Sequence, residues 1–94
     1  MPWKEAKRAV IECLIEGSIQ YELRDHINLK NKLSTGEVSR QQVIDLLRRA
    51  RGNEHNESPH HVHKTVTVHV VKTRRWYIKW YILDPDAVFI SVHD

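Results

Sequence analysis

Cysteine is almost absent from this sequence of 94 residues. Cys13 is the only one, so no disulfide can form within the chain. Its neighbours Val10, Ile11 and Leu14 are apolar, and nothing beside it in the sequence would lower the pKa of the thiol. We therefore expect Cys13 to be packed in the protein interior rather than to act as a nucleophile.

Long apolar runs are also absent. No unbroken apolar stretch exceeds a few residues, which is too short to span a membrane, and no segment resembles a signal peptide. We therefore expect a cytoplasmic protein with no membrane partner. Linkers, repeats and low-complexity tracts are missing too, so residues 1–94 are expected to form one domain with a thin stability margin.

The chain carries a modest positive charge. Fifteen lysines and arginines against 12 acidic residues give +3, before the seven histidines are counted. Such a balance favours polyanionic partners such as nucleic acid, although many small basic proteins have none. With 40% hydrophobic and 29% charged residues, the composition is that of a globular protein and excludes a disordered one.

Residues 1–52 are expected to be the helical half of the domain. The apolar residues of segment 3–16 recur at helical spacing on one face: Trp3, Ala6, Val10, Cys13 and Leu14. Gly17 marks the end of this helix. Residues 19–21 are expected to be extended, and residues 23–33 to be helical. Four basic residues cluster in that second helical segment: Arg24, His26, Lys30 and Lys32.

The strongest helix start lies at Ser39. Ser39 is the expected N-cap, and Gln42 completes a capping box three residues later. Val38 and Val43 occupy the positions of a hydrophobic staple. The helix is expected to continue through the next apolar residues to a left-handed cap at Gly52.

A polar loop is expected at residues 53–61. In residues 62–94, which follow it, the apolar residues recur at every second position instead of at helical spacing. The apolar positions are even-numbered: Val66, Val68, Val70, Trp76, Ile78, Trp80, Ile82, Val88, Ile90 and Val92. Turns at residues 73–75 and 84–86 separate three strands of an antiparallel meander. We therefore expect an α+β fold, with two or three N-terminal helices on the even face of an antiparallel sheet of three or four strands.

The odd-numbered face of this sheet is the expected functional face. Its polar members include His69, Tyr77, Lys79, Tyr81, Ser91 and His93, with Arg74 and Arg75 at the rim. If each hairpin has a three-residue loop, Lys79 lies between His69 and Ser91. Aromatic rings stack on RNA bases, cations hold phosphates, and a histidine or lysine can exchange a proton with a 2′-hydroxyl. The same residue types also occur on any half-exposed sheet, so both interpretations stay open.

Four histidines, at positions 55, 60, 61 and 63, lie in the expected polar loop or at the start of the first expected strand. A zinc site needs three or four ligands with an ordered second shell, and the nearby sequence offers no fourth ligand to His60, His61 and His63. We therefore expect a solvated histidine-rich loop, no metal site and no cofactor.

Two stretches resemble the RelE-like toxin superfamily, the barnase–colicin–RelE group of small metal-independent ribonucleases. One runs from Tyr21 to His26 and continues, after Lys30 and Lys32, through residues 38–47. The other, residues 76–83 with residues 87–93, is similar to the closing hairpin of the motility quorum-sensing regulator toxins (MqsR).

This resemblance implies an endoribonuclease that cuts messenger RNA by attack of the 2′-hydroxyl, with an antitoxin protein as partner. Lys79 and Tyr81 match the lysine and tyrosine on the central strands of such toxins, and His26 matches the family histidine. We expect the catalytic residues to be Lys79, His69, His93 and Tyr81, and the RNA-binding residues to be Arg74, Arg75, Tyr77, His26 and Lys30. Unlike the family pattern, the strands themselves contain no arginine.

Two other classes of function remain open. One is a non-catalytic nucleic-acid or protein-interaction module that uses the same face of the sheet. The other is a regulatory protein whose edge strand pairs with a partner chain.

Overall fold

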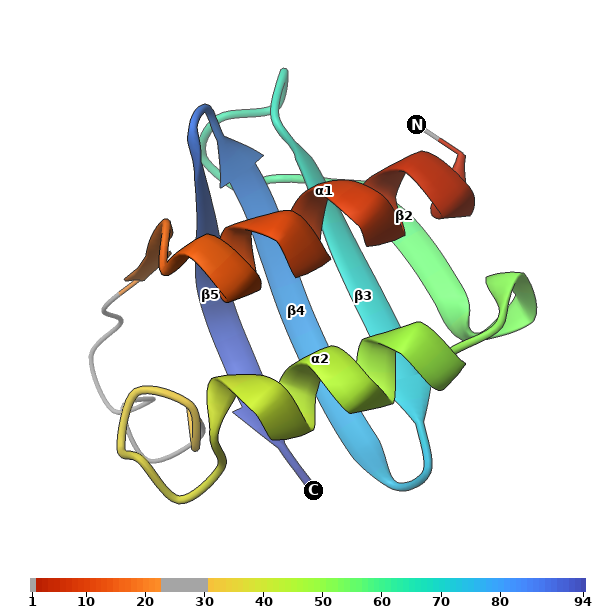
Figure 1. Ribbon diagram of the computed structural model, residues 1–94. Coiled ribbons are helices and arrows are strands. Elements are labelled where there is room, and N and C mark those ends of the chain that lie inside the picture. The colour runs from red at the N-terminus through yellow and green to blue at the C-terminus, as the bar shows by residue number, and fades with distance from the viewer. Residues whose placement is uncertain (1, 23–30) are drawn as a thin grey trace.

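The computed structural model of the protein describes residues 2–22 and 31–94. Two helices, α1 (Trp3–Glu16) and α2 (Arg40–Arg49), cover one face of a five-stranded sheet (Figure 1). The strands are β1 (Ile19–Tyr21), β2 (His55–Pro59), β3 (Thr67–Thr73), β4 (Trp76–Leu83) and β5 (Asp86–His93). The α+β class is therefore confirmed. The expected antiparallel sheet of three or four strands is wrong, because there are five strands and β1 is parallel to its neighbour. No described helix is long and apolar enough to span a membrane.

Helix α1 buries the face that its sequence pattern predicts. Ala6, Val10, Cys13 and Leu14 are all buried. The helix stops at Gly17, whose φ of 79° lies in the left-handed region that glycine adopts without strain. The predicted helix and its predicted end are both confirmed.

Helix α2 begins as the capping box predicts. The backbone N–H of Gln42 donates to the hydroxyl of Ser39 at 3.1 Å, and the side-chain oxygen of Gln42 accepts from the N–H of Ser39 at 2.8 Å. Val38 and Val43 are both buried, at the positions that a hydrophobic staple requires. This start is therefore confirmed in detail.

The carboxyl end of α2 is closed by α1 rather than by a glycine. The residue after the helix, Ala50, is extended, so the expected left-handed cap at Gly52 is wrong; Gly52 instead opens a short 3₁₀ turn (η2, Gly52–Glu54). Lys7 Nζ donates to the carbonyl oxygens of Arg48 and Ala50, and the indole N–H of Trp3 also donates to Ala50. The Lys7 ammonium thus lies at the negative end of the α2 dipole and joins the two helices.

The strands are ordered β1–β5–β4–β3–β2 in the sheet. Strands β3, β4 and β5 form the expected antiparallel meander, and β2 adds to it beyond β3. Residues 55–59, which were expected to lie in a loop, are therefore an edge strand. Residues 62–66, which were expected to begin the first strand, form turns that precede it.

The side chains of β3 were assigned to the wrong faces of the sheet, because its pairing with β4 differs from the expected register by one residue. The β3–β4 turn contains only Arg74 and Arg75, both with positive φ (49° and 70°), so Thr73 pairs with Trp76. A two-residue turn of this type replaces the expected three-residue loop, and a slip of one residue turns every side chain to the other face. Odd-numbered Val71 consequently lies in the core under the helices, and even-numbered Val68 lies on the opposite face.

Strand β5 changes face part-way along. Trp80 pairs with Phe89, and Lys79 pairs with Ser91, which leaves Ile90 as the extra residue of a β-bulge. Ala87 and Phe89 therefore join the core in place of the expected Val88 and Ile90, and Val92 lies there as expected. The prediction for β4 is confirmed, since Ile78 and Trp80 are fully buried in that core.

The face of the sheet that points away from the helices is called the outer face below. Its strand residues include Val68, Val70, Lys72, Tyr77, Lys79, Tyr81, Val88, Ser91 and His93. Residues 60–66, which connect β2 to β3, pass behind the sheet in Figure 1. The ring of His60 packs edge-on against Tyr81 with centroids 5.1 Å apart, so this connection lies over one end of the outer face. The other end of that face, near the β3–β4 turn, is where polar side chains gather.

Candidate nucleic-acid interface

A stack of two rings lies at this end of the outer face. Tyr77 on β4 and His93 on β5 are cross-strand partners, with ring centroids 5.2 Å apart and ring planes inclined by 20°. Lys72 on β3 is the partner of Tyr77 on the other side, and its Nζ lies 5.8 Å from the centre of the tyrosine ring. The three adjacent strands thus present a cation and two half-buried rings side by side.

The turn that follows β3 adds two arginines to this stack. Arg74 and Arg75 are both exposed. A hollow of about 330 Å³ lies here, lined by Lys72, Thr73, Arg74, Arg75, Trp76, Tyr77, His93 and Asp94. Its walls therefore combine cationic groups with aromatic surface. The set Lys72, Arg74, Arg75, Tyr77 and His93 is called the cationic end below.

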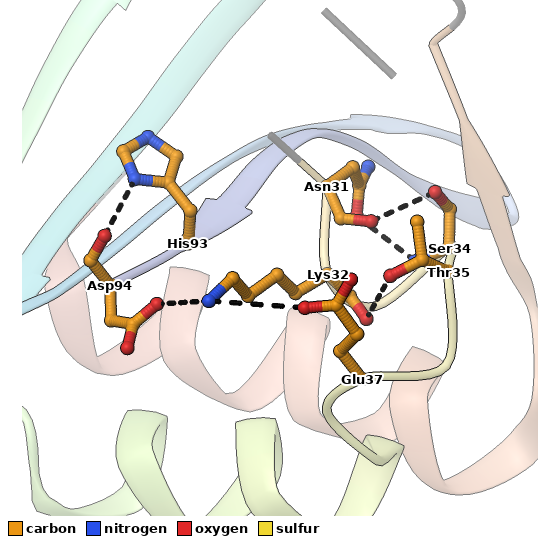
Figure 2. Close-up of polar contacts among 7 residues, drawn as sticks. All are labelled: Asn31, Lys32, Ser34, Thr35, Glu37, His93 and Asp94. Carbon is orange, nitrogen blue, oxygen red and sulfur yellow. Dashed lines mark hydrogen bonds and ion pairs between the residues drawn. The ribbon is translucent and has the colours of Figure 1, made fainter. Parts of the chain in front are cut away.

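Among the described residues that line this hollow, one has a carboxylate side chain, and a lysine donates a hydrogen bond to it. Asp94 accepts a hydrogen bond from Lys32 Nζ, and Glu37 lies 3.9 Å from the same ammonium group, as Figure 2 shows. The hydrogen bond from Lys32 lowers the pKa of the Asp94 carboxyl and raises the pKa of Lys32. Because Lys32 compensates the charge of Asp94, this carboxylate should oppose an incoming anion only weakly.

The segment that carries Lys32 is itself fixed to β5. The N–H of Lys32 donates to the carbonyl oxygen of Val92 at 2.7 Å, and the buried amide of Asn31 donates to that of Phe89 at 3.2 Å. Asn31 also bonds to Ser34 within the following turn (Figure 2). These contacts hold the end of β5, and with it His93, in place.

A second hollow of about 330 Å³ adjoins the first. It is lined by Arg49, Arg51, Asn53, Glu54, Thr73 and Arg74, so Arg74 and Thr73 border both hollows. Glu54 accepts a hydrogen bond from the backbone N–H of Arg51, and this bond lowers the pKa of the Glu54 carboxyl. Three arginines thus face one ionised carboxylate, which leaves an excess of positive charge on both sides of the β3–β4 turn.

The predicted site residues are only partly brought together. Lys79 and Ser91 are cross-strand partners on the outer face, as predicted, and the pairing of Tyr77 with His93 is also as predicted. His69 is not beside Lys79: it pairs with Trp80, is buried beneath the helices and lies on the opposite face. The one-residue difference in the β3–β4 turn accounts for this displacement. His26 and Lys30 lie outside the described residues.

Tyr81 lies on the outer face but takes part in a different cluster. Its partner there is Val88 rather than Phe89, because the β4–β5 turn has two residues instead of the expected three, and the bulge restores the expected register only beyond Trp80. The Tyr81 hydroxyl donates to the Glu22 carboxylate at 3.1 Å, and Nε2 of His60 lies 2.9 Å from the same oxygen. The sequence did not predict the contact of Glu22 with Tyr81. Glu22 follows β1, and β1 is separated by β5 from β4, which contains Tyr81.

His60 does not belong to a solvated loop, contrary to expectation. Its side chain is buried, and Nδ1 accepts hydrogen bonds from the backbone N–H groups of Val62 and His63, both at 3.1 Å. Nδ1 is therefore the acceptor and Nε2 carries the proton that is donated to Glu22. Because both ring nitrogens are engaged, His60 shapes the connection between β2 and β3 and has no free lone pair for a substrate or metal.

Comparisons with known proteins add no assignment. The chain matches no protein-family model, no curated protein and no solved structure. Its function must therefore be argued from its own side chains.

Proposed function

We propose that this protein binds single-stranded RNA at the cationic end. The observation that carries the proposal is the stack of Tyr77 on His93, with Lys72 against the tyrosine ring and two exposed arginines in the adjoining turn.

The geometry of the cationic end favours an unpaired strand. Bases that are splayed out of a single strand can stack on aromatic side chains, whereas bases within a duplex cannot reach them. Lys72, Arg74 and Arg75 line the same hollow as the two rings, so their charges can contact the phosphates of a strand whose base stacks there.

The proposal is tested by the fluorescence anisotropy of a labelled single-stranded RNA titrated with the protein at several salt concentrations. If three cations contact phosphates, the logarithm of the binding constant should fall with the logarithm of salt concentration with a slope of about −2. Absence of binding at low salt, or binding that salt does not weaken, would contradict the proposal.

A pair of arginine variants separates local contacts from overall charge. Arg75→Ala should weaken binding and make the salt slope less steep by about 0.7, because one phosphate contact is lost. Arg8→Ala removes the same charge from an exposed position on α1, on the helix side of the molecule. It should leave the affinity nearly unchanged; equal effects of the two variants would favour non-specific attraction.

A second candidate function is cleavage of the bound RNA. It is favoured by the placement of Lys79, Ser91 and His93 on the same face as the cationic end, where Lys79 and His93 can serve as proton donor and acceptor. His69 cannot contribute, because it lies buried on the other face, and the Tyr81 hydroxyl is bonded to Glu22. The resemblance to RelE-like toxins suggests the same activity, with an antitoxin as partner.

Cleavage and binding can be distinguished in one experiment. A ribonuclease of this kind should cut RNA in EDTA and leave a 2′,3′-cyclic phosphate, and Lys79→Ala should slow it about a hundredfold to ten-thousandfold. Lys79→Ala should keep the fold, because the side chain points away from the core. If RNA stays whole in EDTA and expression does not arrest growth, binding without cleavage is the function that remains.

A further inference from the structure

Three side chains with metal-ligating atoms meet on the helix side of the sheet, opposite the outer face. His55 and Glu57 both lie on edge strand β2, two residues apart, and Glu57 is the cross-strand partner of His69 on β3. His55 Nε2 lies 2.9 Å from His69 Nδ1, and one oxygen of Glu57 lies 3.7 Å from that Nδ1 and 4.0 Å from that Nε2. Two strands thus bring three donor atoms within 4.0 Å of one another.

The two imidazoles are enclosed by aromatic rings. The ring of Trp3 on α1 stacks on His55 at 4.7 Å, and Trp80 stacks on His69 at 5.4 Å. Only 7% of the His55 side chain and 4% of the His69 side chain are exposed, against 34% for Glu57. Burial lowers the pKa of both histidines.

We propose that His55, Glu57 and His69 form a binding site for a divalent transition-metal ion of the zinc type. The point equidistant from the three donor atoms lies about 2.1 Å from each of them, which is the length of a zinc–nitrogen or zinc–oxygen bond. Two imidazoles and one carboxylate are ligands that suit zinc rather than magnesium or calcium, which prefer oxygen atoms alone.

Metal binding requires one proton to move. The two imidazoles now share a hydrogen bond, so one of the facing nitrogens carries a proton and the other does not. When both nitrogens ligate the metal, that proton transfers through solvent to the other nitrogen of the same ring, and both rings stay neutral. The rings must also turn slightly, because a tetrahedral angle at the metal separates the two nitrogens by more than the present 2.9 Å.

The proposed metal site is open to solvent beside Glu57, and a metal bound there would link two strands. Glu57 is the most exposed of the three ligands, so water can complete the coordination from the edge of the sheet. The metal would tie edge strand β2 to β3, in a small domain that has no disulfide. Because metal binding at such a site adds to folding stability, the ion should raise the melting temperature. This role is independent of RNA binding on the outer face, and it departs from the expectation that the chain has no metal site.

The test uses the protein without an affinity tag, stripped with a chelator and titrated with Zn²⁺ by calorimetry and by thermal unfolding. One ion should bind per chain and Tm should rise. Glu57→Gln keeps the shape of the side chain but removes the charged ligand, and it should weaken binding by at least about tenfold. Since Glu57 is partly exposed, this variant should fold; His55→Ala gives a second, independent loss of a ligand.

The matched control concerns the neighbouring exposed histidines. His61→Ala combined with His63→Ala should leave the zinc affinity unchanged, because both side chains lie outside the cluster and are exposed. Absence of one-to-one binding, or binding that survives Glu57→Gln and His55→Ala but is lost in the double control, would overturn the proposal.

Discussion

The hydroxyl of Tyr81 on β4 donates a hydrogen bond to the carboxylate of Glu22, which follows β1, at 3.1 Å. Strand β5 lies between these two residues in the sheet. The bond therefore crosses the outer face over β5 and ties the parallel edge of the sheet to its centre. Together with His60, which bonds to the same oxygen, it closes one end of the outer face.

This bond predicts a measurable contribution of Tyr81 to stability. Tyr81→Phe removes the donor and keeps the ring, so the free energy of unfolding should fall by about 1 kcal/mol. Urea denaturation followed by circular dichroism measures it. Tyr77→Phe is the matched control, since no hydrogen bond from the Tyr77 hydroxyl is formed among the described residues, and its effect should stay within about 0.5 kcal/mol. Equal effects of the two variants would contradict the prediction.

The amino end of α2 should be sensitive to its cap. Ser39→Ala leaves the N–H of Gln42 without its acceptor and should lower the free energy of unfolding by about 1 kcal/mol. The same denaturation experiment checks this, with Ser58→Ala on the exposed edge strand as a control of the same chemistry. A loss no larger than that of the control would show that the capping box contributes little to the fold.

Tyr77 should matter to RNA binding for its ring rather than for its hydroxyl. Tyr77→Ala removes the stacking surface and should cost about 1–3 kcal/mol of binding free energy, whereas Tyr77→Phe should bind nearly as the wild type does. Anisotropy titrations of the same labelled RNA provide the comparison. If both variants lose affinity equally, the ring is not a stacking platform.

The thiol of Cys13 should react slowly in the folded protein. Burial raises the pKa of this thiol above its usual range, and the thiol also lies 3.5 Å from the carbonyl oxygen of Pro85. A raised pKa means less thiolate at pH 8, so labelling with Ellman's reagent should be at least about tenfold slower in buffer than in denaturing urea. Similar rates in the two conditions would show that Cys13 is accessible.

Helices α1 and α2 and strand β4 could be predicted from the sequence because their signals are local, whereas residues 31–33, which were expected to end a helix, form a bridge to β5 and a turn. In α2, Ser39 and Gln42 are three residues apart and determine their own hydrogen bonds, and in β4 the alternation around Ile78 and Trp80 is unbroken. The β1 segment was recognised as extended, but its parallel pairing with β5 involves residues almost 70 positions later, for which no local signal exists.

The site was less predictable, because it depends on register. Val66, Val68 and Val70 alternate as a buried face should, and nothing in their sequence shows that Val68 would instead be buried on the outer face, beside Tyr81 and the connection that packs on it. The real inward face of β3 contains His69, which aromatic rings make tolerable in the core. A turn shorter by one residue was enough to separate His69 from Lys79.

Strand β5 has a further consequence for how this chain is made. On one side it pairs with β4, and on the other it holds β1 and the segment at Asn31 and Lys32. Translation proceeds at about 5–20 residues per second. A ribosome therefore synthesises β1 and the segment at Asn31 and Lys32 several seconds before residues 86–93 appear. Until then, β1 has no strand to join and Trp80 lacks the ring of Phe89 beside it. The nascent chain should therefore complete its fold only after β5 leaves the exit tunnel, and a message truncated ahead of Asp86 should yield a product that is degraded rather than one that is merely weakened.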